Sequence, residues 1–374
     1  MTDKKIKILH LFYILGGVGT SIELIVKNTD DKEFDHVVIN GSTNSDHSLF
    51  KGMKKVYHLD VNREIRPFQD LKLLFKLINI CKKEQPDLIH AHSSKGGILG
   101  KVAAFISGKP CLHTPQAYSF LSTQNKFKKK FYLFIEKALK ILPHKILASS
   151  PSEANRAINE VKYSKKRVAT FPNAINPIHE VPDLSINKEW PDEYICTVGR
   201  PSYQKNIELM IDVIDQVKKE KPDIHLVVMG VGSYSPNTKS VEEKIAHLGL
   251  EHNITLLKWT SRNDIFRIIH DAQFYISTAR YEGLPYAVVE SLALGKAQIL
   301  SDADGNRDLI EEGENGFLIF AENLEVYKQR IIELLNYKEK CAAFGKHSKK
   351  LFDKHFNINN TIKNLETIYK NESL

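Results

Sequence analysis

The chain has 374 residues, of which 42% are hydrophobic and 26% charged, which is typical of a soluble globular protein and enough for two domains. No apolar run approaches the ~18 residues of a membrane span, and the polar start Met1–Lys7 is unlike a cleaved signal. The four cysteines lie far apart, which excludes a Cys-x-x-Cys pair and favours reduced thiols in a cytoplasmic protein.

The formal net charge of +8 is unevenly distributed along the chain. Residues 1–185 hold 29 Lys and Arg against 17 Asp and Glu, whereas residues 186–374 hold 24 against 28. A basic first half suits a nucleic acid, an anionic membrane or an acidic ligand, and charge alone does not choose among them.

A glycine-rich turn follows the first predicted strand, Lys7–Leu15. It reads Gly16-Gly17-Val18-Gly19 and leads into a helix that we expect to end near Asn28. Such a turn presents backbone N–H groups and a helix dipole to an anion. Its spacing departs from Gly-x-Gly-x-x-Gly, and the next strand, His36–Asn40, ends without the acidic residue that binds an adenosine ribose. The pattern therefore argues against a dinucleotide site.

Strands and helices continue to alternate up to a group of histidines. The predicted elements are Lys55–Leu59, Gln69–Lys83, Pro86–His90, Ile98–Ile106 and Pro110–His113. His90 and His92 have a His-x-His spacing, but no third ligand at a sensible spacing accompanies them, so we expect them to line the mouth of the sheet rather than bind a metal. His113 ends a strand, where it either faces the same crevice as the glycine turn or is structural.

The segment Tyr118–Lys145 interleaves aromatic and basic residues. Among its lysines are Lys126, Lys128, Lys129 and Lys130. A helical face of this kind suits an anionic membrane surface. The alternative is a helix whose aromatic side chains pack inward while its lysines are solvated.

A second alternating series begins after a proline-containing linker, Asn176–Asp192. Its predicted strands and helices are Tyr194–Val198, Ile207–Lys219, His225–Gly230, Ser240–Leu248, Ile254–Leu257, Asn263–Asp271, Gln273–Ser277, Val288–Leu294, Gln298–Ser301 and Asp308–Glu312, followed by charged amphipathic helices. Two such series predict an α/β protein with two doubly wound, Rossmann-like parallel sheets that face each other across a cleft. The predicted domains are residues 1–182 and 190–355.

Two acidic residues stand eight positions apart in the stretch Tyr281–Glu290. Glu282 is placed on a loop after a buried strand, because Gly283 and Pro285 interrupt regular structure, and Glu290 is placed in the following helix. Ligands of parallel sheets bind at this edge, and carboxylates accept hydrogen bonds from hydroxyl groups. The pair therefore suits a polyhydroxylated ligand.

Arg200 and Lys205 lie on one strand-to-helix loop of the second series. Arginine offers a fork of donors for phosphate oxygens, and lysine a compact positive charge. Together with Glu282 and Glu290 they describe a ligand with a diphosphate between hydroxyl-bearing groups. A sugar nucleotide is such a ligand.

In this order the motifs resemble those of the family 4 glycosyltransferases, retaining enzymes of the GT-B fold. The resemblance spans nearly the whole chain and rests on Gly16-Gly17, His92, His113-Thr114, Pro172-Asn173, Gly199-Arg200, Lys205-Asn206, Glu282-Gly283-Leu284-Pro285, Glu290 and Asp304-Gly305. It implies an acceptor-side first domain, a donor-binding second domain, and a C-terminal helix, at about residues 356–374, that crosses back onto the first domain.

The resemblance also implies roles for individual residues. Arg200 and Lys205 neutralise the departing diphosphate, Glu290 accepts hydrogen bonds from the ribose, and Glu282 contacts the transferred sugar. The backbone of Gly283, Leu284 and Pro285 assists Glu282, Gly16 and Gly17 contribute to the phosphate site, and His113 faces the donor sugar near the reacting centre. His92 and the four lysines are assigned to the acceptor or membrane side.

The sequence departs from the family at two positions. An Ala/Gly-Glu pair usually follows the double glycine, and Gly usually follows Pro172-Asn173, where this chain has Ala174. Here Val18-Gly19-Thr20-Ser21-Ile22 separates the double glycine from Glu23, so the acceptor side of this turn differs from the family pattern. Asp302-Ala303-Asp304 mimics the metal-binding Asp-x-Asp of a different transferase fold but lies on the wrong loop, so we expect no metal and no cofactor.

The predicted activity is transfer of a sugar from a nucleotide diphosphate sugar to a glycan or polyprenyl-linked acceptor in polysaccharide or surface-glycan assembly. A UDP-sugar is the favoured donor because it is frequent in the family. We expect a cytoplasmic protein that associates with the inner face of the membrane. The alternatives are a sugar-nucleotide epimerase or hydrolase of the same fold, a basic nucleic-acid-binding protein and a non-catalytic scaffold. No nucleic-acid motif is recognisable, and the scaffold leaves Arg200, Lys205, Glu282 and Glu290 without a role.

Overall fold

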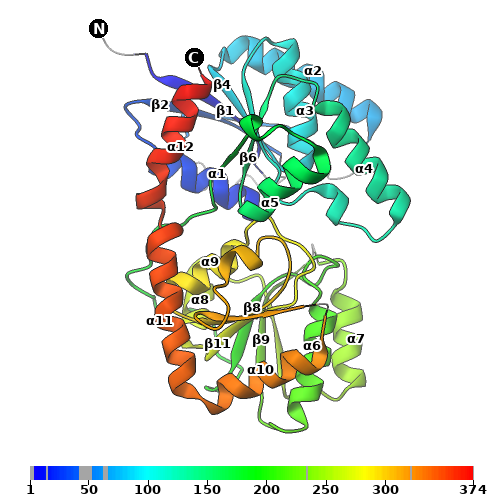
Figure 1. Cartoon of the computed structure of the whole chain (residues 1–374), viewed down its shortest axis with the longest axis vertical. Helices are drawn as coiled ribbons and strands as arrows, with labels where there is room; N and C mark the ends of the chain where they lie inside the picture. The colour runs from blue at the N-terminus through cyan, green and yellow to red at the C-terminus, as the bar shows by residue number, and fades with distance from the viewer. Residues whose placement is uncertain are drawn as a thin grey trace. The chain divides into compact units, whose positions relative to one another are not determined.

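The computed structural model describes residues 4–13, 16–41, 53–61, 66–232, 235–320 and 322–373. The chain divides into two compact units, one formed by Met1–Asn176 with Ile358–Leu374 and the other by Pro177–Asn357. Each unit has one parallel sheet with helices packed against it (Figure 1). The prediction of two doubly wound α/β units is therefore confirmed.

The first unit is built on a seven-stranded sheet in the order β3-β2-β1-β4-β5-β6-β7. All of its neighbouring strands are parallel. The strands are β1 (Ile6–Tyr13), β2 (Phe34–Asn40), β3 (Lys55–His58), β4 (Leu88–His92), β5 (Cys111–Thr114), β6 (Lys145–Ala148) and β7 (Val168–Thr170). The last two residues of the predicted first strand lie outside the described residues.

Helices cover both faces of this sheet. The helices are α1 (Gly17–Asn28), α2 (Pro67–Glu84), α3 (Ser93–Ile106), α4 (Lys126–Leu139), α5 (Pro151–Arg156) and α12 (Ile358–Glu372). On one face, Leu77 of α2 and Ala103 of α3 join Leu9 of β1 in the core. On the other face, Ile22 of α1 packs on Val38 of β2. Strands buried on both faces explain the continuous apolar runs of the sequence.

Helix α12 completes the first unit although it comes from the end of the chain. It lies beside α1 (Figure 1). The hydroxyl of Tyr369 is hydrogen-bonded to Nδ1 of His90 at 2.7 Å, and the Glu366 carboxylate accepts from the Asp30 backbone N–H at 2.8 Å. Residues from Ile358 onward therefore belong to the first core.

The second unit is built on a six-stranded parallel sheet in the order β10-β9-β8-β11-β12-β13. The strands are β8 (Ile195–Val198), β9 (Leu226–Val231), β10 (Ile254–Lys258), β11 (Phe274–Ser277), β12 (Ala297–Ser301) and β13 (Gly316–Ile319). The helices are α6 (Ile207–Lys218), α7 (Thr238–His247), α8 (Arg262–Asp271), α9 (Tyr286–Ala293), α10 (Leu324–Asn336) and α11 (Lys338–His355). Its core joins residues of α6, such as Met210 and Ile214, to strand residues such as Ile276 and Ile299.

The strand order reverses once in each sheet, between β1 and β4 and between β8 and β11. The crevice beyond the carboxyl ends of the strands at such a reversal is where ligands of these sheets bind. The glycine turn follows β1, the loop of Arg200 and Lys205 follows β8, and the loop of Glu282 follows β11. The topology thus brings the predicted site residues to the reversal points of the two sheets.

Several boundaries differ from the sequence-based expectations. Strand β4 extends to His92 and α3 begins directly at Ser93, so the segment predicted as a loop before residue 98 is already helical. The predicted helix Asp308–Glu312 is only a 3-10 turn, Arg307–Leu309, and β13 was not predicted. The start of α3 was predicted too late because Gly96 and Gly97 have low helix propensity.

Candidate functional site

Three loops meet at the carboxyl edge of the second sheet. The loop after β11 is fastened to the loop after β8 by the Arg280 N–H, which donates to the Gln204 carbonyl at 2.8 Å, and by the Thr278 hydroxyl, which donates to the Asn206 carbonyl at 2.9 Å. The loop after β12 joins them, because the Glu282 N–H donates to the Asp304 carbonyl at 3.0 Å. These hydrogen bonds, two between backbone groups and one from a side-chain hydroxyl, fasten the loops of the predicted site residues to one another.

Lys205 and Glu282 form an ion pair in this frame. The Lys205 Nζ lies 2.7 Å from Glu282 Oε1, and the Gln204 amide donates to Glu282 Oε2 at 3.1 Å. Glu282 is buried, while the Lys205 side chain retains 23% of its exposure. A buried carboxylate with partners on both oxygens is held in one orientation. The structure therefore brings together two residues that are 77 positions apart in the sequence.

Arg200 lies close to the same group. Burial, assisted by the neighbouring Glu282 and opposed by Arg200, raises the pKa of the Tyr281 hydroxyl to about 12. Arg200 is thus near enough to Tyr281 to influence its charge. Arg200, Lys205 and the N-terminus of α6 all belong to the segment that follows β8, so positive charge is concentrated in that segment.

Glu290 lies in the second turn of α9 and is also buried. Burial raises the pKa of its carboxyl group, and Arg262 opposes this by an ion pair in which Arg262 Nη2 lies 2.6 Å from Glu290 Oε1. Arg262 begins α8, after the cap residue Ser261. The sequence-based prediction missed Arg262, since the Ser261 cap signals a helix start but nothing in the sequence links that start to Glu290.

Two glycines shape the loop that carries Glu282. Gly305 has φ +80°, and a Cβ at that position would lie 2.7 Å from the Gly283 carbonyl oxygen. Only glycine allows this approach. Asp304, beside it, is paired with Arg307 at 2.6 Å. Asp302 is also paired with Arg307, so both carboxylates of Asp302-Ala303-Asp304 form ion pairs with the same arginine.

In the first unit, Gly16 and Gly17 are placed at the start of α1. Gly16 has φ +106° and is the N-cap, with no side chain capping the helix, and Gly17 is the first helical residue. The first N–H groups of a helix have no intrahelical acceptor. This end of α1 therefore offers donors to an anion, as the sequence predicted.

His113, at position 3 of β5, is completely buried. Its Nε2 donates to the Ser93 carbonyl at 3.0 Å, which leaves Nδ1 as an acceptor with no partner among the described residues. A Cβ at Gly97 would lie 2.1 Å from the ring, so Gly97 makes room for His113. Burial, assisted by Lys101 and His144, lowers the pKa of His113 well below its ordinary value. Its imidazole is therefore neutral.

His92 was predicted among the acceptor-side residues at the mouth of the sheet, but the structure buries it completely as the last residue of β4. The expectation that no third potential metal ligand accompanies His90 and His92 was wrong. Among the described residues, His10, His90 and His92 have ring nitrogens within 4.8 Å of one another. The reason is topological: β1 and β4 are neighbours, and His10 is in register with His90.

Hydrogen bonds join three of the buried histidines, His36, His10 and His92, in a row. Nε2 of His36 is bonded to the Thr29 hydroxyl, which itself donates to the Ile25 carbonyl, so Nε2 carries the proton. Nδ1 of His36 then accepts from His10 Nε2 at 3.0 Å, and Nδ1 of His10 accepts from His92 Nε2 at 3.1 Å. Burial and neighbouring imidazoles lower the pKa of His10 and His92 well below the ordinary value, and burial lowers that of His36 to about 4. The cluster is a neutral, directional chain of imidazoles.

The aromatic and basic segment divides into two parts. Tyr118 and Phe120 are buried, as in the inward-packing alternative. On α4 the opposite holds, with Phe127, Phe131 and Phe134 exposed at 86%, 54% and 66%. The four lysines predicted for this surface, Lys126, Lys128, Lys129 and Lys130, are exposed on the same helix. The inward-packing alternative therefore holds for Tyr118 and Phe120 but not for the exposed phenylalanines of α4.

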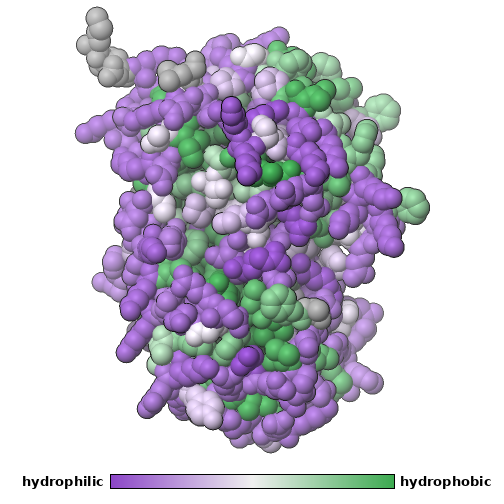
Figure 2. Space-filling view, in the orientation of Figure 1, coloured by the Kyte–Doolittle hydropathy of each residue, from purple (hydrophilic) through white to green (hydrophobic). Residues whose placement is uncertain are grey.

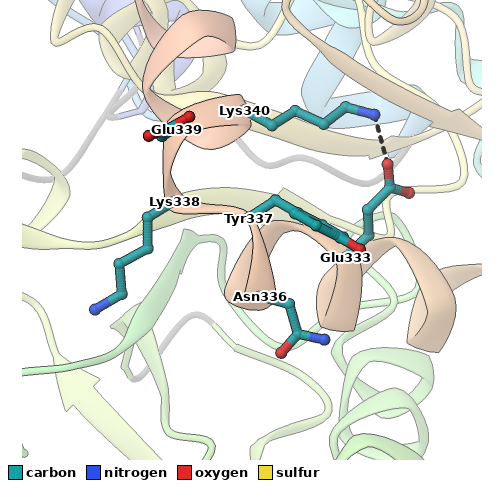
Figure 3. Close-up of a pocket in the computed structure, with 6 residues that line it drawn as sticks. All are labelled: Glu333, Asn336, Tyr337, Lys338, Glu339 and Lys340. Carbon is teal, nitrogen blue, oxygen red and sulfur yellow. Dashed lines mark hydrogen bonds and ion pairs between the residues drawn. The ribbon is translucent and has the colours of Figure 1, made fainter.

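A cavity of about 590 Å³ lies elsewhere in the second unit, where α10 meets α11 (Figure 3). It is lined by Glu333, Asn336, Tyr337, Lys338, Glu339 and Lys340. The Lys340 ammonium is paired with Glu333, and Lys338 with Glu193, so these cations are already neutralised. This cavity contains none of the predicted site residues and offers no surplus charge to a diphosphate.

Comparisons with known proteins cover both units. A family profile described as "Glycosyltransferase Family 4" matches residues 15–178, and one described as "Glycosyl transferases group 1" matches residues 184–351. The chain is 26% identical to an Escherichia coli UDP-Gal:alpha-D-GlcNAc-diphosphoundecaprenol alpha-1,3-galactosyltransferase, over 98% of this chain and 97% of the relative.

Two solved structures share the fold. Sucrose-phosphate synthase from Thermosynechococcus elongatus aligns with a TM-score of 0.81 at 15% identity, over 98% of this chain and 99% of that chain. Anabaena HepE in complex with UDP-glucose aligns with a TM-score of 0.79 at 19% identity, over 97% and 99%.

Proposed function

The chain belongs to the family 4 glycosyltransferases and has the GT-B fold, and on that premise we propose that it transfers a sugar from a UDP-sugar to a hydroxyl of a glycan or lipid-linked acceptor, with retention of the anomeric configuration. The observation that carries the proposal is the Lys205–Glu282 pair beside Arg200 at the strand-order reversal of the second sheet. The named donors of the E. coli relative and of the HepE complex support a uridine diphosphate.

In this proposal the second unit binds the donor. Arg200 and Lys205 face the diphosphate, and Glu282 accepts hydrogen bonds from hydroxyls of the transferred sugar, with the backbone from Gly283 to Pro285 beside it. Glu290, held by Arg262, accepts from the ribose hydroxyls. The Lys205–Glu282 pair keeps both charges in place before the donor arrives, so little reorganisation is needed when it binds.

The reaction follows from the charges that develop in it. The bond between the anomeric carbon and the diphosphate oxygen breaks, and its electron pair leaves with the diphosphate. The acceptor hydroxyl oxygen attacks the same face of the sugar and gives its proton to the departing phosphate oxygen. Arg200 and Lys205 stabilise the leaving group, and preorganised cations in a site of this kind contribute several kcal/mol. We propose that these cations make a metal unnecessary.

The first unit supplies the acceptor side. We propose that Gly17 at the start of α1 donates its N–H to the phosphate and that His113 is near the reacting centre, where its neutral Nδ1 accepts a hydrogen bond from the donor sugar. The acceptor of the E. coli relative is a sugar on a diphospholipid, and its counterpart here would be a polyprenyl-linked glycan.

Exposed aromatic side chains on neighbouring helices of the first unit support a lipid-linked acceptor. Beyond α4, exposed aromatic side chains occur on α2, at Phe68 and Phe75, and on α3, at Phe105. Helix α3 packs against both α2 and α4, so these side chains belong to neighbouring helices. Figure 2 shows hydrophobic side chains along the upper right margin, where Figure 1 has α2 and α4. No helix among the described residues has the length and apolarity to cross a bilayer. We propose peripheral binding to the anionic inner face of the cytoplasmic membrane.

A donor and acceptor assay tests the proposed function. Purified protein is incubated with UDP-, GDP- and ADP-sugars and with a synthetic α-D-GlcNAc-diphospholipid, with and without EDTA. We expect transfer from a UDP-sugar that EDTA does not abolish, and a product with the anomeric configuration of the donor. Sugar release at the same rate without the acceptor would instead identify a hydrolase, and an EDTA-sensitive transfer would contradict metal independence.

A further inference from the structure

Gln116 has a side-chain amide that nothing in the described part of the chain satisfies. Both its Oε1 and its Nε2 are buried and have no hydrogen-bond partner there. Buried polar atoms are nearly always paired, and an unpaired donor or acceptor costs about 1–3 kcal/mol. Gln116 has an unpaired donor, Nε2, and an unpaired acceptor, Oε1, so its amide can bind a ligand that both donates and accepts hydrogen bonds.

The backbone at this position is held in an unfavourable conformation. Gln116 has φ 51° and Ala117 has φ 76°, so two successive residues that are not glycine adopt left-handed geometry. Each costs on the order of 1–3 kcal/mol, and such residues persist where the surrounding structure imposes them. A glycine at either position would remove that cost.

Glu153 of α5 imposes this geometry. Its Oε1 accepts the Ala117 N–H at 2.7 Å, and its Oε2 accepts the N–H and the hydroxyl of Ser149 at 2.7 and 2.8 Å. Glu153 itself is 2% exposed. The backbone directly after Gln116 is therefore anchored from the next strand-to-helix connection.

The loop joins the carboxyl edge of the sheet to the membrane-facing helix. Gln116 follows β5 by two residues, and β5 is the neighbour of β4 beside the strand-order reversal. The chain then passes through the turn Ser119–Leu121, which packs on α4. The segment that leads from the carboxyl end of β5 to the exposed phenylalanines of α4 thus contains an unsatisfied amide.

We propose that the Gln116 carboxamide recognises the acceptor sugar, donating to one hydroxyl through Nε2 and accepting from another through Oε1. A hydroxyl both donates and accepts, so an amide matches a pair of sugar hydroxyls in a way that a charged group cannot. This inference rests on the proposed transfer to a lipid-linked glycan. It adds to that proposal the residue that recognises the sugar of the lipid-linked acceptor.

Substitutions at Gln116 separate recognition from stability. Gln116→Gly removes the amide and relieves the left-handed backbone, so its melting temperature should equal or exceed that of the wild type. Gln116→Asn keeps an amide, tolerates left-handed geometry and shortens the side chain by one methylene. Ala117→Gly is the matched control, because it relieves the neighbouring φ and leaves the amide in place.

The variants are assayed with UDP-galactose and a synthetic α-D-GlcNAc-diphospholipid, and UDP binding is measured by calorimetry. For Gln116→Gly we expect KM for the acceptor to rise about tenfold, as the loss of one or two hydrogen bonds implies, with UDP affinity and folding preserved. Gln116→Asn should fall between it and the wild type, and Ala117→Gly should match the wild type.

Each outcome bears on one claim. An acceptor KM for Gln116→Gly within twofold of the wild type overturns the inference and leaves the proposed function intact. A fall in UDP affinity with an unchanged acceptor KM assigns Gln116 to the donor and also overturns it. If the wild-type protein transfers no sugar to this lipid, the proposed acceptor is refuted, and the inference with it.

Discussion

Nη2 of Arg262, the first residue of α8, lies 2.6 Å from Oε1 of Glu290 on α9. Glu290 is buried and its pKa is raised by burial, so the arginine is what favours its charged form. In its proposed role as acceptor for two ribose hydroxyls, this carboxylate has to be ionised and correctly oriented. The pair provides both conditions from two neighbouring helices.

Glu290→Gln and Arg262→Met should each weaken UDP binding by about tenfold, measured by calorimetry, because each removes or misorients a charged acceptor. The double variant should be little worse than either single one, since the two residues act as a unit. Arg267→Met is the control, because Arg267 is on the same helix and pairs with Asp183 and Asp271. Strictly additive losses would contradict the coupling.

Lys205→Met and Arg200→Ala should each lower kcat/KM by on the order of 100-fold, as loss of a group that stabilises developing charge does. Lys205→Met also leaves the buried Glu282 without its cation. Lys219→Met is the matched control, since Lys219 follows α6 and pairs with Asp215. If either site variant has a kcat/KM near the wild-type value, the residue it replaces does not stabilise the leaving group.

Gly305→Ala should impair catalysis in a way that Gly313→Ala does not. Both glycines have left-handed φ, +80° and +76°, so both substitutions incur a backbone penalty of about 1–2 kcal/mol. Only at position 305 would the new Cβ meet the Gly283 carbonyl, at 2.7 Å, and displace the loop of Glu282. The measurements are kcat/KM and the melting temperature of both variants. Equal kcat/KM values would show that the position of the Glu282 loop does not affect catalysis.

Acid should destabilise the first unit through its buried histidines. The pKa of His36 is lowered from 6.5 to about 4, so the unfolded chain takes up its proton first. Stability is therefore complete above pH 6.5 and is lost as the pH falls from 6.5 towards 4, by about 2 kcal/mol at pH 5 for this residue. Urea titrations at several pH values measure the slope.

His36→Gln should flatten this pH dependence, because a glutamine amide can donate to Thr29 and has no proton to gain. His247→Gln, at an exposed position of α7, should leave it unchanged. A slope that persists undiminished in His36→Gln would mean that this histidine does not contribute to it.

The aromatic surface of α4 predicts binding to anionic vesicles at low salt. The triple variant Phe127→Ser, Phe131→Ser and Phe134→Ser should bind at least tenfold more weakly, since burying one phenylalanine contributes about 1.5–3 kcal/mol. Trp259→Ser, which removes an exposed aromatic residue of the second unit, is the control. Equal co-sedimentation of the triple variant and wild type with phosphatidylglycerol vesicles would contradict the proposed surface.

The sequence predicted the fold because its strands are continuous apolar runs separated by turn residues, and such local patterns survive in the structure. It also predicted that Lys205 and Glu282 lie on loops after buried strands, and the structure places them there, because glycines mark both loops. It could not predict Arg262 or His10 as partners of Glu290 and His92. Those contacts depend on which helices and strands become neighbours, and no local pattern encodes that.

The place of α12 has a consequence for how the chain folds during synthesis. The second unit, Pro177–Asn357, is one continuous segment, whereas the first needs Ile358–Leu374 to supply Tyr369 for His90 and Glu366 for Asp30. Domains fold as units while the chain is made, in general from the N-terminus. Here the first unit cannot complete its core until Ile358–Glu372 has been made, although its other residues precede the whole of the second unit in the chain.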